Sequence, residues 1–338
     1  MLPTLHILSA PYLPVDINIR TDAFGVAIVK FINNMTKLGW NCIHYGIAGS
    51  HVNCEMVQCL PVIPSSKNDA IEQYNKTAGV EISKRKKSGD ILLCYYGYEN
   101  HIAASMNTDL IVVEPSIGYC TSAVFAPYRI FVSHAQRHFY YGERGMLMTP
   151  SWTDAVIPNA ITPEEFEYND QKSDYVLFIG RVIESKGVKL AIRATEQAKV
   201  KLVIAGEGSL SDLGVNEIPS HVSEFGVANE IQRRFLMKHA RAIIGPSLYV
   251  EPFGNMVVEG YMSGTPAITT DWGGFTETVI QGKTGFRCKS EQEFVDAIQH
   301  IDELDNKFCR SWAESTFNDQ VVHAQYDKYF KDLINSVK

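Results

Sequence analysis

The chain has 338 residues, 45% of them hydrophobic and 20% charged, an ordinary globular composition with enough length for two domains of about 150 residues each. Its formal net charge is -7, with 12 Lys and Arg against 11 Asp and Glu in residues 1–150 and 19 against 27 in residues 151–338, so general attraction to nucleic acid is not predicted. No run approaches the roughly 18 apolar residues of a membrane span, and the first residues lack the basic start of a secretion signal, so no transmembrane segment is expected.

The cysteines indicate a reducing compartment. There are seven, an odd number, and none forms a Cys-x-x-Cys pair. Cys42, Cys94 and Cys288 lie in apolar segments, where we expect buried free thiols. A cytoplasmic location is therefore predicted.

Short apolar runs alternate with helical patterns in the first half. Helical spacing follows Gly25 until Gly39 ends it. Strands are predicted at Leu5–Ser9, Cys42–Tyr45, Ile91–Tyr95, Leu110–Val113 and Arg129–Val132. This alternation favours a parallel sheet wrapped by helices, which binds ligands at the carboxyl ends of its strands. The loops that contain Asp22 to Gly25, His101 and Glu114 are therefore candidate site segments.

A proline-punctuated linker at residues 150–173 precedes a second alternating series. Strands are predicted at Tyr175–Ile179, Lys201–Ala205, Ala242–Gly245 and Ala267–Thr270, and helices at 186–198, 255–263, from about 276, at 291–301 and at 319–335. We expect an α/β fold of two Rossmann-like, doubly wound parallel-sheet domains that face a central cleft. The predicted boundaries are 1–155, 156–318 and a C-terminal helical segment at 319–338.

A loop that turns into a short helix is predicted between Ser247 and Pro266. Pro252 and Gly254 allow the turn, and Asn255 is expected to cap the helix. The first N–H groups of a helix lack partners and carry the positive end of its dipole, which makes the Phe253–Met256 segment a candidate anion site.

Two carboxylates, Glu251 and Glu259, flank this anion site. Carboxylates repel a phosphate but accept hydrogen bonds from hydroxyl groups, so a ligand with sugars on both sides of a phosphate is indicated. Arg181 and Lys186 lie in the loop between a predicted strand and helix, where a planar fork and a point charge suit a diphosphate. Together these residues predict a nucleotide-sugar site.

The same residues form a pattern that resembles glycosyltransferase family 4, whose members are retaining enzymes of the GT-B fold. The resemblance covers residues 175–288, and Glu251-x7-Glu259 is its most specific part. The matching positions are Gly180-Arg181…Lys186-Gly187, Gly206-Glu-Gly208, Pro246-Ser247…Glu251-Pro-Phe-Gly-Asn…Glu259, Gly264-Thr-Pro266 and Gly273-Gly274…Glu277…Gly282-Lys-Thr-Gly285.

The resemblance implies a role for each matching residue. Arg181 and Lys186 would hold the diphosphate and stabilise charge on the departing nucleotide. Glu251 would face the hydroxyls of the transferred sugar and Glu259 the ribose. Backbone N–H groups at Phe253, Gly254, Asn255 and Met256 would add to the diphosphate site, and Gly206 also falls at a donor-binding position.

The resemblance also implies that the donor is a nucleotide-diphosphate sugar, with a UDP-sugar favoured. No tightly bound cofactor is expected. A metal ion is not expected either, since the sequence has no Asp-x-Asp motif at the end of a predicted strand. The loop near Val222–Gly226 would border the base. The last helix in this fold commonly returns to pack on the first domain, a role expected for residues 319–335.

The first half departs from the family pattern. Many members carry a histidine at the strand end where this chain has Glu114, which leaves either Glu114 or His101 as its substitute. Glu114 would bind sugar or acceptor hydroxyls if it is not structural, and His101 would contact the donor if it is not a capping residue. Gly25 fits a glycine-rich turn near the donor sugar, and Asp22 is expected to be a cap.

This half also resembles small glycosyltransferases of tailed phages, through the segments 114–119, 125–129 and 156–159. The cytoplasm would then be that of a bacterium or of a phage-infected host cell. Because some phage enzymes modify 5-hydroxymethylcytosine, DNA is an alternative acceptor beside a glycan, a small molecule or a lipid. The basic run Lys84–Lys87 keeps that alternative open, although a solvated helix end is its simpler interpretation.

Three other classes compete with a hexosyl- or pentosyltransferase. A dehydrogenase would need G-x-G-x-x-G, and Gly206-Glu-Gly208 lacks the third glycine. A nucleotide-sugar epimerase or hydrolase on the same fold would consume donor without acceptor. A non-catalytic nucleotide-sugar-binding protein would release no product. The oligomeric state is not predicted.

Overall fold

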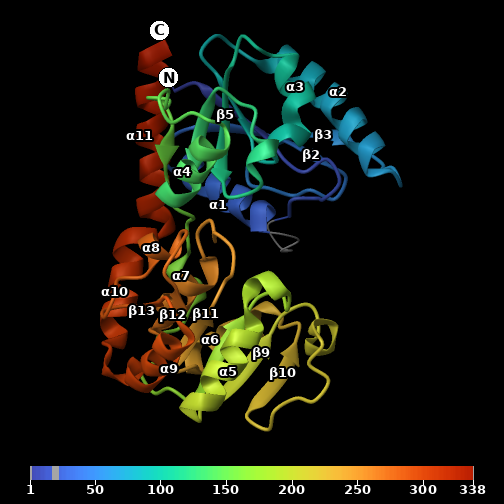
Figure 1. Ribbon diagram of the computed structural model, residues 1–338. Coiled ribbons are helices and arrows are strands. Elements are labelled where there is room, and N and C mark those ends of the chain that lie inside the picture. Colours follow the sequence, from blue (N-terminus) through green and yellow to red (C-terminus); the bar gives the residue numbers. More distant parts are fainter. Residues whose placement is uncertain (1, 17–22, 338) are drawn as a thin grey trace. The chain divides into compact units, whose positions relative to one another are not determined.

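The computed structural model describes residues 2–16 and 23–337, and these form two compact units (Figure 1). Unit 1 draws on residues 1–132, 137–160 and 319–338, and unit 2 on residues 133–136 and 161–318. Asp22 lies outside the described residues.

Unit 1 is built on a parallel sheet with the strand order β3-β2-β1-β4-β5-β6-β7. Its strands are β1 (Thr4–Leu8), β2 (Asn41–Ile47), β3 (Glu55–Leu60), β4 (Ile91–Cys94), β5 (Ile111–Ile117), β6 (Tyr128–Phe131) and β7 (Ala155–Val156). Its helices are α1 (Ala23–Lys37), α2 (Lys67–Arg85), α3 (His101–Ser105), α4 (His134–Glu143, whose first residues are counted in unit 2) and α11 (Asp319–Val337).

Helices cover both faces of this sheet, which explains why its central strands β1 and β4 are buried almost along their whole length. Leu5 and Ile7 of β1 pack with the apolar stripes of α1 and α11. Leu8 belongs to the cluster formed with α2 and α3. The C-terminal helix is tied to this unit by polar contacts as well, since the Trp40 indole donates to Asp327 at 2.9 Å.

Unit 2 has a parallel sheet with the strand order β10-β9-β8-β11-β12-β13. Its strands are β8 (Tyr175–Ile179), β9 (Lys201–Ala205), β10 (Val222–Gly226), β11 (Ala242–Gly245), β12 (Ala267–Thr270) and β13 (Gly285–Cys288). Its helices are α5 (Val188–Ala198), α6 (Glu230–His239), α7 (Asn255–Met262), α8 (Phe275–Thr278), α9 (Glu291–His300) and α10 (Asn306–Phe317). Helices α5 and α9 share one core cluster with the sheet (Figure 1).

The predicted pair of parallel-sheet α/β domains is confirmed. The segment Val222–Gly226, near which a loop was expected to border the base, is itself the edge strand β10. An edge strand with only Val222 buried lacks the apolar run that reveals central strands. Cys42, Cys94 and Cys288 are buried free thiols, as predicted. Across the described residues, no helix is both long and apolar enough to cross a membrane.

His44 on β2 is a buried polar side chain that should make the fold acid-sensitive. Neither of its ring nitrogens has a hydrogen-bond partner among the described residues, and burial lowers its pKa from 6.5 to about 4. Between those pH values His44 becomes protonated in the unfolded chain but stays neutral in the folded one. The free energy of unfolding therefore falls as the pH falls. The loss amounts to about 3 kcal/mol across this window.

We therefore expect His44→Leu to unfold with a shallower pH dependence between pH 6.5 and 4, measured by urea denaturation. At pH 7 the variant should be at least as stable as the parent, because replacing an unpaired buried polar group by an apolar one removes its desolvation cost. Parallel pH profiles for parent and variant would contradict this account of His44.

Candidate functional site

The strand order of unit 2 identifies where a ligand should bind. Chain direction across the sheet reverses between β8 and β11, and open α/β sheets bind ligands outside the carboxyl ends of their strands at such a reversal. The loop after β8 contains Arg181 and Lys186, and the loop after β11 leads to Glu251 and helix α7. The sequence motif therefore falls on both sides of the topological switch point.

Backbone hydrogen bonds join these loops to one another and to the loop after β12. The N–H of Leu248 donates to the carbonyl of Ser185 at 2.8 Å, and the N–H of Gly274 donates to the carbonyl of Glu251 at 2.6 Å. The side chain of Trp272 donates to the carbonyl of Tyr249 at 3.1 Å. The segment around Glu251 is thus held from both sides before any ligand arrives.

Lys186, Tyr249 and Glu251 form a closed hydrogen-bonded group at this site. The Lys186 ammonium donates to the Tyr249 hydroxyl at 2.6 Å and to Oε2 of Glu251 at 2.7 Å. The Tyr249 hydroxyl donates to the same carboxylate oxygen at 2.7 Å, and the Ser247 hydroxyl reaches it at 3.2 Å. The side chains of Lys186 and Glu251 keep only 20% and 12% of their surface exposed, so this ion pair is largely shielded from solvent.

Arg181 is exposed at the start of the loop after β8. Its charge acts on the Tyr249 hydroxyl: burial and Glu251 raise the pKa of Tyr249, and Arg181 opposes that shift. The structure therefore places Lys186 against Glu251 and Arg181 within electrostatic reach of Tyr249. The Tyr249 hydroxyl keeps its proton under ordinary conditions and serves as a donor.

Glycine is required where the loops meet most closely. A Cβ on Gly187, which has φ +70°, would lie 1.9 Å from the carbonyl oxygen of Pro246. A Cβ on Gly206 would lie 1.8 Å from the carbonyl oxygen of Gly180. These close approaches explain why Gly187 and Gly206 belong to the motif: each lets one loop after a strand touch the next.

We expect Gly187→Ala to lower the free energy of unfolding by about 3 kcal/mol, because the added methyl group overlaps a backbone carbonyl as well as disfavouring positive φ. Gly214→Ala is the matched control, since Gly214 has φ +77° but no atom of the described residues within 4 Å of the place that a methyl group would occupy. The control should lose only the conformational cost of about 1 kcal/mol. If chemical denaturation showed the same loss of unfolding free energy in Gly187→Ala and Gly214→Ala, the close approach to Pro246 would make no contribution to stability.

Helix α7 starts differently from the sequence expectation. Gly254 is its N-cap with φ +88°, and Asn255 is the first helical residue, so the prediction that Asn255 caps the helix is wrong. Gly254 rather than Asn255 is the N-cap because this position has a left-handed conformation, which glycine adopts without steric cost. Gly273 and Gly274 pack against the backbone from Glu251 to Phe253. The positive end of α7 remains beside the loop that contains Glu251.

Glu259 lies one turn further into α7 and pairs with Arg233 of α6. Its side chain is 13% exposed, which leaves one edge open to a ligand. Arg233 was not singled out in the sequence, because a charged residue on a helix face with no motif around it gives no signal.

Glu114 in unit 1 is fully buried and engaged within its own unit. Its carboxylate accepts from the Tyr119 hydroxyl at 2.8 Å and from the N–H groups of Phe125 and Ala126 at 2.8 and 2.6 Å. Burial raises its pKa, although these three donors oppose the rise. Through these bonds Glu114 stabilises the loop between β5 and β6. It is not part of the Lys186–Tyr249–Glu251 group.

His101 lies beyond a strand end, as expected, whereas Gly25 lies within a helix. The His101 ring stacks on Tyr98 with centroids 4.8 Å apart and meets the edge of Phe125 at 5.2 Å. It starts α3, at a carboxyl-end loop beyond β4. Gly25 is buried inside the first turn of α1 rather than in a turn before it. Both residues belong to unit 1, as Glu114 does, whereas Arg181, Lys186, Glu251 and Glu259 belong to unit 2.

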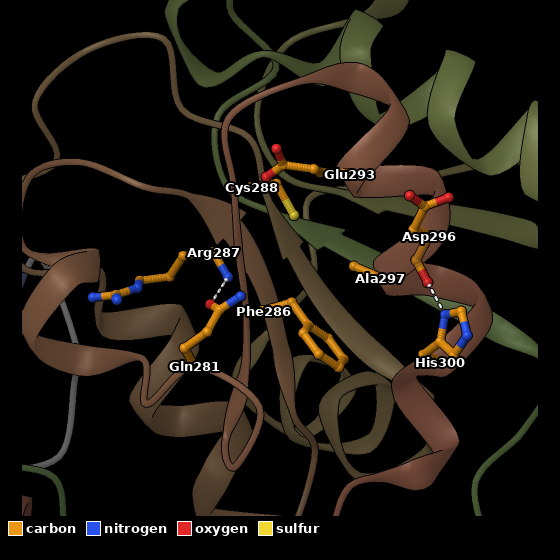
Figure 2. A pocket seen from close by; sticks show the side chains of 8 residues that line it. All are labelled: Gln281, Phe286, Arg287, Cys288, Glu293, Asp296, Ala297 and His300. Carbon is orange, nitrogen blue, oxygen red and sulfur yellow. Dashed lines mark hydrogen bonds between the residues drawn. The ribbon is translucent and has the colours of Figure 1, made fainter.

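Figure 2 shows a separate pocket between the end of the unit 2 sheet and α9. It is lined by Gln281, Phe286, Arg287, Cys288, Glu293, Asp296, Ala297 and His300. None of the candidate site residues lines it. Within the described part of the chain, no cluster of three or more His, Cys, Asp or Glu side chains is arranged to hold a metal ion.

Comparison with known proteins identifies the class of fold. A glycosyltransferase involved in avilamycin A biosynthesis superposes with a TM-score of 0.75 at 17% identity, covering 98% of each chain. Anabaena HepE, solved in complex with UDP-glucose, superposes with a TM-score of 0.73 at 14% identity, covering 97% of this chain and 99% of that one. The chain therefore has the GT-B fold, as the resemblance implied.

The family match falls on unit 2. Residues 162–319 match the family described as Glycosyl transferases group 1. An uncharacterized glycosyltransferase of Methanocaldococcus jannaschii is 33% identical over 158 residues, which cover 39% of this chain and 40% of that relative. The match thus spans less than half of the relative's length.

Proposed function

We propose that this protein is a retaining glycosyltransferase of family 4 that moves a sugar from a nucleotide-diphosphate sugar to an acceptor hydroxyl. The observation that carries the proposal is the Lys186–Tyr249–Glu251 group at the topological switch point of unit 2, beside the positive end of α7. The ammonium group can bind the phosphate of a sugar phosphate, and the carboxylate beside it can accept hydrogen bonds from the sugar hydroxyls.

The chemistry assigns a role to each charged group. Leaving of the nucleotide builds negative charge on its phosphate, and preorganised donors directed at developing charge are usually the largest catalytic contribution. Arg181, Lys186 and the N-terminal turn of α7, from Phe253 to Met256, supply those donors. Glu251 accepts hydrogen bonds from the sugar hydroxyls through Oε1, since its bonds to Lys186 and Tyr249 end on Oε2. Glu259 accepts from the ribose.

A UDP-sugar is the favoured donor. Support comes from the family of residues 162–319 and from the HepE structure, which was solved with UDP-glucose. No metal ion takes part in the proposed mechanism, because the cations of Arg181 and Lys186 and the dipole of α7 are positioned to neutralise the diphosphate.

The acceptor is proposed to be a glycan, a small molecule or a lipid rather than DNA. The basic run that kept a DNA acceptor open ends helix α2, and its charges are largely compensated locally. Lys84 and Arg85 pair with Glu81, and Lys86 pairs with Asp109. Paired cations release few counterions from a phosphate backbone and so give little affinity for DNA.

Single-turnover product analysis tests the transferase proposal. The protein is mixed with labelled UDP-glucose, with and without a panel of sugar, lipid and hydroxymethylated-DNA acceptors, and the products are separated and examined by NMR. A transferase gives a glycoside only with acceptor, and retention gives the same anomeric configuration as the donor. Free glucose or an epimerised nucleotide sugar formed equally without acceptor would support a hydrolase or an epimerase instead.

A further inference from the structure

We propose that Tyr249 is a positioning residue of the donor site, whose hydroxyl group holds Lys186 and Glu251 in the arrangement that binds a sugar diphosphate. This inference rests on the proposed function and adds a residue to it. The motif residues Lys186 and Glu251 are 65 positions apart in the chain, and Tyr249 contacts both of them.

The Tyr249 hydroxyl completes a ring of three hydrogen bonds. It accepts from the Lys186 ammonium at 2.6 Å and donates to Oε2 of Glu251 at 2.7 Å, while Lys186 and Glu251 bond directly at 2.7 Å. A hydroxyl is suited to this position because it can accept and donate at once. Each charged group is thereby held by two partners rather than one, which restricts its rotation.

The ring has a direct consequence for the carboxylate. Three donors, from Lys186, Tyr249 and Ser247, converge on Oε2 of Glu251. All three bonds end on Oε2, so Oε1 takes no part in the ring. An ion pair without the tyrosine could close with both oxygens on the ammonium, and the carboxylate would then have no oxygen left for a sugar hydroxyl.

Tyr249 is itself held firmly. Its carbonyl accepts from the Trp272 indole at 3.1 Å, and its ring centroid lies 4.9 Å from the Lys186 ammonium. Because the ammonium is 2.6 Å from the hydroxyl, it lies at the hydroxyl end of the ring rather than over the ring face. Tyr249→Phe therefore removes the hydroxyl and its hydrogen bonds and keeps the aromatic ring.

The test compares Tyr249→Phe with Tyr175→Phe, in which a tyrosine of the same unit loses a hydroxyl that donates to the Leu236 carbonyl at 2.7 Å. Calorimetry measures the binding of UDP-glucose and UDP to each full-length variant. We expect Tyr249→Phe to bind UDP-glucose about 10- to 100-fold more weakly, as for the loss of a hydrogen bond to a charged group. Tyr175→Phe should bind within about twofold of the parent.

A double-mutant cycle with Lys186→Ala separates positioning from general stability. If Tyr249 acts through Lys186 and Glu251, its substitution should weaken binding by less than about threefold once Lys186 is absent. An equal effect in both backgrounds, or equal losses in Tyr249→Phe and Tyr175→Phe, overturns the inference.

The outcomes also distinguish the inference from the function on which it rests. Parent-like binding by Tyr249→Phe, with binding lost in Lys186→Ala, refutes the role of Tyr249 and leaves the donor site standing. Failure of the parent protein to bind UDP-glucose, UDP or any other nucleotide sugar refutes both.

Discussion

Replacing Lys186 by alanine should lower the rate of sugar transfer roughly 10²–10³-fold, the usual cost of losing one donor to charge that develops in the transition state. The ammonium is positioned by Tyr249 and Glu251 at the switch point of unit 2. UDP should also bind about 10- to 100-fold more weakly, since a hydrogen bond to a charged phosphate is lost. Initial rates and calorimetry measure these two effects.

Lys189→Ala is the matched control for this prediction. Lys189 lies on α5 shortly after Lys186 and pairs with Glu184 at the surface, where such pairs contribute little. The control should retain parental rates and UDP affinity. Arg181→Ala should behave like Lys186→Ala while keeping the fold, as judged by its thermal transition. Near-normal transfer in both Arg181→Ala and Lys186→Ala would exclude the diphosphate assignment.

Glu251→Gln should lower sugar transfer by about 10- to 100-fold and yet leave UDP affinity equal to or higher than that of the parent. The carboxylate is assigned to the sugar hydroxyls, so its charge strengthens hydrogen bonds to the sugar but repels the diphosphate. Glutamine preserves the shape and keeps an acceptor oxygen without the charge. The two substitutions in one ion pair are thus expected to move UDP binding in opposite directions.

The measurement for Glu251→Gln is a pair of titrations, with UDP and with UDP-glucose, alongside initial rates. Glu259→Gln provides a comparison within α7, since Glu259 pairs with Arg233 and is assigned to the ribose. Its substitution should weaken UDP and UDP-glucose alike. A loss of UDP affinity in Glu251→Gln as large as in Lys186→Ala would contradict the division of roles between the two residues.

The strands and loop contacts of unit 2 were predictable because their features are local in sequence. Glycines that allow loop contacts, a cation before a helix and carboxylates around a helix start each leave a readable pattern. Gly187 and Gly206 illustrate this, since a Cβ on either would lie less than 2 Å from a carbonyl oxygen of the neighbouring loop. The strand–loop–helix order then places the motif at the carboxyl edge of a parallel sheet.

Tyr249 could not be found in the same way. Its hydroxyl bonds to Lys186, 63 positions away, and that contact depends on how two loops pack after the sheet has formed. A tyrosine near the end of a strand is equally compatible with a core or a surface position. Arg233 escaped prediction for the same reason, because its partner Glu259 lies on a different helix.

Glu114 shows what a position at a strand end leaves open. The sequence allowed either a ligand-binding or a structural role for this carboxylate, and in the structure β5 has an irregular register between Glu114 and Ile117. The following loop folds back and supplies three donors to the carboxylate from Tyr119, Phe125 and Ala126. Long-range loop packing of this kind leaves no periodic signal in the sequence.

The central claim is that unit 2 binds a nucleotide-diphosphate sugar through Lys186 and Glu251. Thermal unfolding of the parent protein and of Lys186→Ala in the presence of a panel of nucleotide sugars tests it most directly, because a ligand that binds the folded state raises its apparent stability. We predict that UDP-glucose or another UDP-sugar raises the melting temperature of the parent and has little effect on Lys186→Ala. No stabilisation of the parent by any nucleotide sugar, or equal stabilisation of both proteins, would contradict the claim.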